Sequence, residues 1–521
     1  MAVKIQLNDP NLFGNDAAED EEDEIFKSYA LERQEIEAFV QSTRQLAFVR
    51  AYKGEGKSAL LRIARSKLLA SNTSAGLIIS TPASNLAPNV NTTDFSVWIR
   101  AWKKSILGRI ATEVGTKIGF AWTDDQMNLV EEAERSGFKQ RNIISTLLRR
   151  FKPEVESGGV KVTVNQPGLE GQNEFEPIMR RWAQGRDPIW IFIDDVDQNF
   201  QNAPEHKNKI ASFFVASREL VNSVPELRIR AAIRPNVWTT IKLEYEALSH
   251  IEQYTIDLQW SEESVLQLLA KRIEGYVTRT SQLNLLPPKL LSDSDSDYRL
   301  VELAFEDSMK WGKGVRPPHV ILNTLSKHRP RWMVELCKNA GKRAQRLNHT
   351  LIKRDDIFAE LSAFGERRIQ DTIAEFRSQC PEIQEILAAF RRTQEEMSTA
   401  ELFSLINNKI LNHLKPRIVG VMGNAQATDV ASFLFEIGFI FGRLDLGEGK
   451  YEHITFSERP HLLKSRTSID DGLRWEIHPI FRQALEVRDV EGREPGPGRK
   501  DKSKQPEQKR TPRKFKVTKG T

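Results

Sequence analysis

The chain contains little cysteine and no long apolar run. Its two cysteines, Cys337 and Cys380, show no disulfide framework and no metal-ligand spacing, which fits a reducing compartment where thiols stay free. No apolar stretch approaches the ~18 residues of a membrane span, and the densest one, residues 433–441, still contains Glu436. The N-terminus carries acidic residues where a signal peptide needs basic and then apolar ones. We therefore expect a cytoplasmic protein without a membrane partner.

An excess of charge of one sign is also missing, since the formal net charge is only +5 over 521 residues. The charges are unevenly placed, however. Seven acidic residues and no basic one lie between Asp16 and Glu24, whereas twelve Lys and Arg oppose five Asp and Glu from Arg488 to the end. This basic tail offers cations that could contact nucleic-acid phosphates without sequence preference. It has only Phe515 for stacking on a base, so a disordered, solubilising end is the alternative.

Apolar runs predict the strands of an α/β protein. The run at residues 189–193 is continuous, which is typical of a strand buried on both faces of a parallel sheet. Length alone predicts roughly three domains. We expect a flexible acidic N-terminus (1–25), an α/β core (26–258) with a helical insertion near 83–185, a helical lid (259–376), a winged-helix-like domain (377–487) and a disordered basic tail (488–521).

A strand over residues 45–51 leads into a glycine loop, and the loop opens a helix. Such a helix N-terminus binds phosphate, because its free N–H groups and the helix dipole both favour an anion. Lys57 can reach the β- and γ-phosphates of a nucleotide, and the Ser58 hydroxyl can ligate Mg²⁺. The pattern GxxxxGK[ST] is broken only at Ala51, and a chance glycine turn is the alternative. We assign the phosphate contacts to Gly54, Glu55, Gly56, Lys57, Ser58 and Ala59.

A second motif, Asp194-Asp195-Val196-Asp197, follows the buried run at 189–193. Ligands of open α/β sheets bind at the carboxyl ends of the strands. Asp194 is suited to hold Mg²⁺ through water, and Asp195 to orient or deprotonate an attacking water. An acidic turn that caps the next helix is the alternative. Both motifs together, in this order, predict a P-loop nucleoside triphosphatase that binds ATP or GTP with Mg²⁺.

These motifs resemble those of the AAA+/STAND group of P-loop ATPases. The resemblance includes the opening helix at 29–36, which in that group flanks the adenine. It implies a sensor role for Arg234, after the strand ending at Ile233, and for Arg331, in a segment that resembles the lid helix. For both arginines a surface ion pair is the alternative. The fold expected is a parallel-sheet P-loop NTPase core with a helical lid and a C-terminal winged-helix-like domain.

More narrowly, residues 26–487 resemble a family of bacterial P-loop ATPases associated with antiphage defence, which also shows a segment like residues 475–481. The resemblance implies an ATP-driven switch that forms homo-oligomers and acts with a separate effector, since the chain shows no nuclease, protease or deaminase motif. Two alternatives stay open. One is a DNA-associated motor or loader that uses the tail and the winged-helix-like domain. The other is a scaffold that binds nucleotide without turnover.

Overall fold

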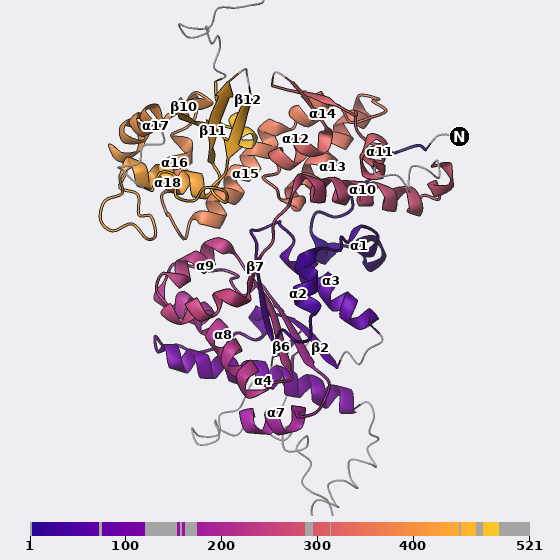
Figure 1. Ribbon diagram of the computed structural model, residues 1–521, viewed down its shortest axis with the longest axis vertical. Helices are drawn as coiled ribbons and strands as arrows, with labels where there is room; N and C mark the ends of the chain where they lie inside the picture. The colour runs from indigo at the N-terminus through magenta and orange to yellow at the C-terminus, as the bar shows by residue number, and fades with distance from the viewer. Residues whose placement is uncertain are drawn as a thin grey trace, which may run out of the picture.

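The computed structural model describes residues 3–71, 76–119, 154–156, 159–161, 175–286, 295–312, 314–447, 450–464 and 472–488. About half of the expected insertion and nearly all of the basic tail therefore lie outside the described residues. Figure 1 shows the core in the lower half, the lid at the upper right and the C-terminal part at the upper left. None of the described helices combines the length and the apolar character that a bilayer crossing requires.

The core is built on one parallel sheet with the strand order β2-β5-β6-β1-β7. Its strands are β1 (Leu46–Arg50), β2 (Leu77–Pro82), β5 (Ile189–Asp194), β6 (Leu227–Ile233) and β7 (Thr255–Asp257). The run at 189–193 is buried on both faces as expected: Ile191 packs into one hydrophobic layer and Trp190 into the other. The α/β class with a parallel P-loop core is confirmed.

Two layers of helices cover this sheet. One holds α2 (Gln34–Val40) and α3 (Lys57–Ala70), and the other holds α4 (Phe95–Gly119), α7 (Phe175–Ala183), α8 (Pro204–Ser223) and α9 (Pro235–Lys242). A small hairpin of β3 (Glu154–Glu156) and β4 (Gly159–Lys161) belongs to the expected insertion. The described ends of that insertion, α4 and α7, belong to the layer on the sheet, where Trp102 is buried against Phe213.

The N-terminal segment, which we expected to be flexible, packs against the lid. Leu7, Leu12 and Phe13 are buried in the hydrophobic core of the lid, and Arg272 of α10 donates to the Phe13 carbonyl. These few apolar residues anchor an otherwise polar segment. It is followed by η1 (Ala18–Asp20) and α1 (Asp23–Tyr29). The lid itself comprises α10 (Glu262–Arg279), α11 (Ser296–Glu302), the hairpin β8 (Met309–Trp311) and β9 (Gly314–Arg316), α12 (Pro318–Leu325), α13 (Pro330–Arg346), α14 (Arg354–Phe358) and α15 (Leu361–Phe376).

The C-terminal part (residues 377–488) has a winged-helix-like order of elements: one short strand follows the first helix, two more helices come next, and three further strands complete the antiparallel sheet β10-β13-β11-β12. Its elements are α16 (Ile383–Ala388), β10 (Glu396–Ser398), α17 (Thr399–Ile406), α18 (Ala427–Glu436), β11 (Ile440–Gly447), β12 (Lys450–Ile454), β13 (Leu473–Ile477) and α19 (Pro479–Arg482). The lid and the C-terminal part share one hydrophobic core, so the expected boundary at residue 376 does not separate two independently packed parts.

Candidate functional site

The glycine loop lies between β1 and α3. Gly54 and Gly56 have φ angles of 87° and 97°, in the left-handed region that residues with a side chain rarely adopt. Gly56 caps α3, and the first helical bond runs from the Leu60 N–H to the Gly56 carbonyl. The N–H groups of the first turn therefore have no partner within the helix and face the loop. This is the anion-binding geometry that the sequence predicts.

The Lys57 side chain folds back onto the glycine loop and donates to backbone carbonyls at its start. Its Nζ lies 2.9 Å from the Ala51 carbonyl oxygen and 3.3 Å from that of Tyr52. The ammonium is thus held at the mouth of the loop, within reach of an anion bound there. Ser58 lies in the first turn of α3, where its hydroxyl can ligate a cation next to that anion.

Glu55 differs from its neighbours, because it is engaged inside the loop. Its carboxylate accepts from the Tyr52 N–H, and its own N–H donates to the Tyr52 carbonyl at 3.2 Å. Burial raises the pKa of Glu55, while nearby Arg329 opposes the shift. Trp260, which the sequence did not single out, donates from Nε1 to the Glu55 carbonyl at 2.8 Å. Glu55 thus shapes the loop in this structure.

The two carboxylates of the second motif lie at the end of β5. Asp195 has a φ of 54°, and its N–H donates to Asp194 Oδ1 at 2.9 Å. The pKa of Asp195 is raised, first by desolvation and then by the Asp194 carboxylate, and Lys57 opposes the shift. A carboxylate with a raised pKa suits the role of a general base.

Arg234 makes an ion pair with Asp197, a partner that the sequence did not identify. Its Nε lies 2.6 Å from Asp197 Oδ2, its Nη2 donates to the Asp197 carbonyl, and its backbone N–H donates to the same carboxylate at 2.9 Å. Asp197 is 2% exposed. The arginine is therefore fixed against the acidic loop after β5, and the ion pair offered as the alternative is present.

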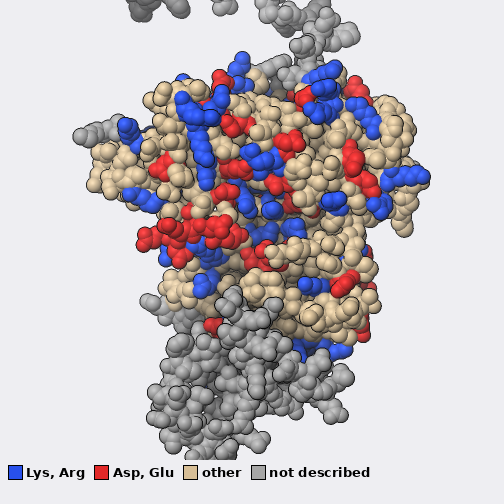
Figure 2. All heavy atoms as spheres, turned by 180° about the vertical axis from the view of Figure 1, so that it is seen from behind, with Lys and Arg blue, Asp and Glu red and all other residues tan. Residues whose placement is uncertain are grey.

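Arg331 brings the lid to the glycine loop. Its backbone N–H donates to the Gly54 carbonyl at 3.2 Å, and its Cβ would lie 3.1 Å from a Cβ placed on Gly54. Its guanidinium extends toward Asp16, with 3.8 Å between Nε and Oδ2. Figure 2 shows acidic side chains gathered where the core meets the lid, and η1 and α1 supply such residues there. The first turn of α13 thus borders the phosphate loop.

These groups fit a magnesium–nucleotide complex. Loop N–H groups and Lys57 suit phosphate, and the Ser58 hydroxyl and the Asp194 carboxylate are oxygen ligands of the kind that Mg²⁺ prefers. Within the described residues, no group of three or more His, Cys, Asp or Glu side chains is arranged to hold a metal ion.

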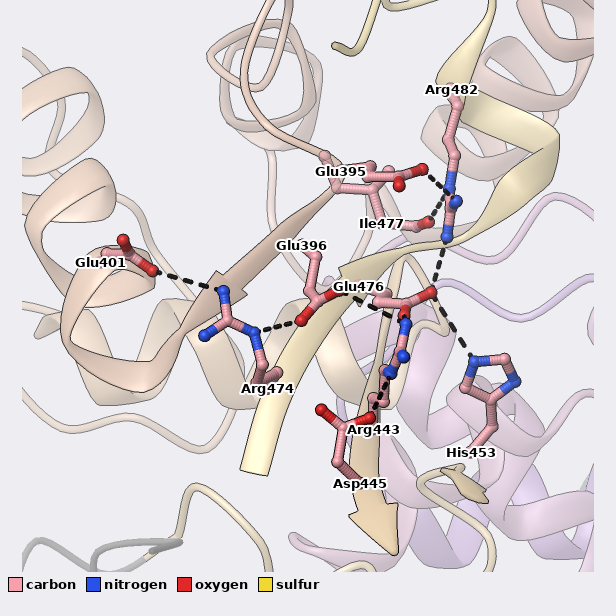
Figure 3. Close-up of polar contacts among 10 residues, drawn as sticks. All are labelled: Glu395, Glu396, Glu401, Arg443, Asp445, His453, Arg474, Glu476, Ile477 and Arg482. Carbon is pink, nitrogen blue, oxygen red and sulfur yellow. Dashed lines mark hydrogen bonds and ion pairs between the residues drawn. The ribbon is translucent and has the colours of Figure 1, made fainter. Parts of the chain in front are cut away.

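The C-terminal part was the other candidate, as a nucleic-acid interface. Helix α18 has the sequence ATDVASFLFE, without a basic residue, and five of its side chains are buried. On the neighbouring sheet and in α19, which follows it, three arginines pair with carboxylates (Figure 3). Arg443 pairs with Glu476 at 2.7 Å and with Asp445 at 3.0 Å, Arg482 pairs with Glu476 at 2.8 Å and with Glu395, and Arg474 pairs with Glu396. Among the described residues, α18 thus offers no cation to phosphates and these arginines are already paired, while Lys450 at the start of β12 is exposed.

Comparisons with known proteins give a distant relative and loose structural likenesses. No protein-family model matches the chain. The "Putative transposon gamma-delta 80.3 kDa protein" of Escherichia coli (strain K12) is 23% identical over 353 residues, which is 67% of this chain and 47% of that protein. The chain therefore spans about half the length of this curated relative.

Three solved structures align with most of the chain. Cdc6p from Pyrobaculum aerophilum has a TM-score of 0.31 at 11% identity, and the alignment covers 90% of this chain and 99% of that one. The Aeropyrum pernix ORC2 protein in ADPNP-ADP complexes has a TM-score of 0.38 at 11% identity and a coverage of 87% of this chain and 92% of that one. Drosophila ORC bound to DNA has a TM-score of 0.30 at 10% identity and a coverage of 93% of this chain and 92% of that one. At TM-scores below 0.5 these likenesses are too loose to carry an argument about function.

Proposed function

We propose that this protein is a Mg²⁺-dependent ATPase that acts as a nucleotide-driven conformational and oligomeric switch. The observation that supports this best is the position of Lys57. Its ammonium bonds to the Ala51 and Tyr52 carbonyls just after the carboxyl end of β1, and Asp195 follows the carboxyl end of β5 in the same parallel sheet. Phosphate-binding and water-activating groups are thus present at one edge of one sheet, as phosphoryl transfer to water requires.

Each residue has a defined task in this proposal. The loop N–H groups from Gly54 to Ala59 and the Lys57 ammonium hold the phosphates, and Ser58 and Asp194 provide oxygen ligands. When bound, Mg²⁺ neutralises phosphate charge. Asp195 orients the attacking water and accepts its proton, for which its raised pKa is suited. Arg234 and Arg331 sense the γ-phosphate, and for Arg234 this requires release from Asp197.

The switch follows from the contact between loop and lid. Because the Arg331 N–H donates to the Gly54 carbonyl, a nucleotide that shifts the loop also shifts the start of α13. We propose that the closed lid promotes homo-oligomers in which a neighbour's arginine completes the site. The setting we propose is bacterial antiphage defence with a separate effector. Its support is the sequence resemblance and the lack of a nuclease, protease or deaminase motif in the chain.

A DNA-associated ATPase is the second candidate. Its support is the basic tail, which lies outside the described residues beyond Arg488, and a relative whose name refers to a transposon. The acidic partners of Arg443, Arg474 and Arg482 weigh against a contribution from the C-terminal sheet. A nucleotide-binding scaffold without turnover is disfavoured by the presence of both Asp194 and Asp195.

Phosphate release by the purified protein, with ATP and Mg²⁺, tests the proposal. We expect steady turnover that chelation of Mg²⁺ abolishes, and a larger particle mass in ATP than without it. Tight binding without turnover would instead support the scaffold. Hydrolysis stimulated by DNA, with salt-sensitive DNA binding, would support the second candidate. GTP in place of ATP tests the base preference.

A further inference from the structure

The entry of the glycine loop, where Ala51 replaces the usual first glycine, is held from outside the core. The Lys53 N–H donates to Glu375 Oε1 at 3.2 Å, and Arg329 Nη1 lies 3.4 Å from the Lys53 carbonyl oxygen. The backbone N–H and the backbone carbonyl of Lys53 are thus both held by side chains that lie far from it in the sequence. Neither of them belongs to the sheet that carries the loop.

Arg329 and Glu375 form a deeply buried ion pair. Arg329 Nη1 lies 2.8 Å from Glu375 Oε2, and the two side chains are 4% and 3% exposed. Burial alone would raise the pKa of Glu375, but the Arg329 guanidinium outweighs it and holds that pKa below its usual range. The guanidinium also lies over the Tyr52 ring, 5.1 Å from its centroid. The pair therefore stays charged while it contacts the loop.

Three parts of the molecule meet at this pair. Arg329 is the N-cap of α13 in the lid. Glu375 lies in the last turn of α15, the helix that leads into the C-terminal part, and its carbonyl accepts from Asn236 Nδ2 of α9 at 2.9 Å. The next residue, Phe376, has its ring 5.9 Å from that of Tyr52. A shift of α15 would therefore disturb both contacts to Lys53.

We propose that Arg329 and Glu375 are positioning residues for the phosphate loop. They hold the Lys53 peptide in place where the loop lacks its first glycine, and they make nucleotide affinity depend on the seating of α15 against the core. This inference rests on the proposed function, since it concerns the same loop. Because such coupling is reciprocal, nucleotide in the loop also stabilises the seating of α15, and displacement of α15 weakens nucleotide binding.

The test replaces the whole pair, because removal of one partner leaves an uncompensated buried charge. Arg329→Met/Glu375→Met removes both contacts to Lys53. Arg329→Gln/Glu375→Gln keeps neutral groups that can hydrogen-bond to Lys53, and it serves if the first variant does not fold. The matched control is Arg368→Met/Glu335→Met, since that pair also joins α15 to α13, at 2.9 Å, and none of its recorded contacts is to the glycine loop.

Two readouts separate positioning from stability in the full chain. The first is the dissociation constant of ADP, measured well below the unfolding transition. We expect it to rise at least about fivefold in the Met/Met variant, less in the Gln/Gln variant, and not at all in the control. The second is hydrogen exchange of residues 51–56 without nucleotide, which should accelerate most in the Met/Met variant, less in the Gln/Gln variant, and not in the control.

The outcomes distinguish this inference from the proposed function. Unchanged affinity and unchanged loop exchange in the Met/Met variant would overturn the inference while the ATPase assignment stands. Equal losses in the Met/Met variant and the control would also overturn it, because they would indicate a general weakening of the lid. A wild-type protein that binds no nucleotide would reject the proposed function and this inference together. If only the Gln/Gln variant folds, wild-type affinity together with wild-type loop exchange overturns the inference, and a loss of both supports it.

Discussion

At the scale of single residues, the backbone at the site was only partly readable from the sequence. The left-handed conformation of Gly54 and Gly56 is what a glycine pattern predicts. The same conformation at Asp195 has no such signal, yet it sets the Asp195 N–H against Asp194 Oδ1. The pairing of Arg234 with Asp197 was equally hidden, since the two residues lie 37 positions apart and each has its own local interpretation.

Lys57→Ala should weaken ATP binding at least about tenfold, because an ammonium that meets phosphate makes a strong, charge-assisted bond. The folded state should lose little, since the hydrogen bonds of Lys57 to the described residues go to two backbone carbonyls, those of Ala51 and Tyr52. Titration with a fluorescent nucleotide and a thermal melt check both points. Hydrolysis at the wild-type rate in this variant would remove Lys57 from the site.

Asp195→Asn should retain ATP and lower the rate of hydrolysis about 10²–10⁴-fold, because the amide cannot accept a proton. In the wild type, turnover should fall as the pH drops through the raised pKa of Asp195, since only the ionised carboxylate acts as the base. Phosphate release measured across pH tests this. Normal turnover in Asp195→Asn with loss in Asp194→Asn would reverse the roles of the two carboxylates.

Gly54→Ala should damage the loop for two reasons. An alanine must adopt the φ of 87°, which costs about 1–2 kcal/mol, and its Cβ would lie 3.1 Å from Arg331 Cβ. Gly185→Ala is the matched control, since Gly185 has a φ of 72° with nothing within 4 Å of an added Cβ. We expect both variants to lose stability and only Gly54→Ala to lose nucleotide affinity. Equal nucleotide affinities in the Gly54→Ala and Gly185→Ala variants would show that crowding by Arg331 does not affect the loop.

At the scale of elements, burial decides what the sequence can predict. The strands β1 and β5 fall within a residue or two of the predicted runs, and β6 ends at the predicted residue, Ile233, because apolar residues in a buried parallel sheet leave a continuous signal. The packing of the N-terminal segment left almost none, since only scattered residues such as Leu7, Leu12 and Phe13 anchor it. Ion pairs between distant elements, such as Arg329 with Glu375, leave no periodic signal at all.

The C-terminal sheet should owe part of its stability to Glu476. Burial opposes its ionisation, yet contacts with His453, Arg482 and Arg443 lower its pKa to about 2. A carboxylate with a depressed pKa contributes stability that is present above its unfolded pKa, near 4.5, and is lost as the pH falls toward about 2. The thermal transition of the wild type should fall across this range.

Glu476→Gln should remove that stability at neutral pH, by roughly 2–3 kcal/mol, because its arginine partners are left without their carboxylate. This figure is below that of a fully buried pair, since Arg443 and Arg482 are partly exposed. Glu486→Gln is the control, because its contacts with Arg391 and Arg392 lie at the surface. Thermal melts of both variants at pH 7 decide the point, and equal small losses would contradict a structural role for Glu476.

At the scale of the whole molecule, the lid and the C-terminal part are packed together as one unit beside the core. Their helices and the sheet share one hydrophobic core, and α15 passes from one to the other beside Tyr52. The sequence pattern separated them at residue 376, because a change from long helices to short helices and strands marks a change of architecture and not of packing. If the proposed nucleotide switch operates, we expect it to move both parts together.

The tail is the last element whose role can be tested by removal. The chain should be cut after Arg488, because Arg488 still pairs with the segment at Thr393 and Glu395. Residues beyond it contain no apolar periodic segment, so the thermal transition and the ATPase rate should barely change.

If the lysines and arginines of the tail bind nucleic acid, the truncation should weaken binding to all sequences alike and flatten its salt dependence, because fewer counterions are released. Binding measured at several salt concentrations compares the two chains. Identical affinities and slopes would leave the tail as a solvated end, and the DNA-associated alternative would then lose its main support, since the arginines of the C-terminal sheet are already neutralised by carboxylates.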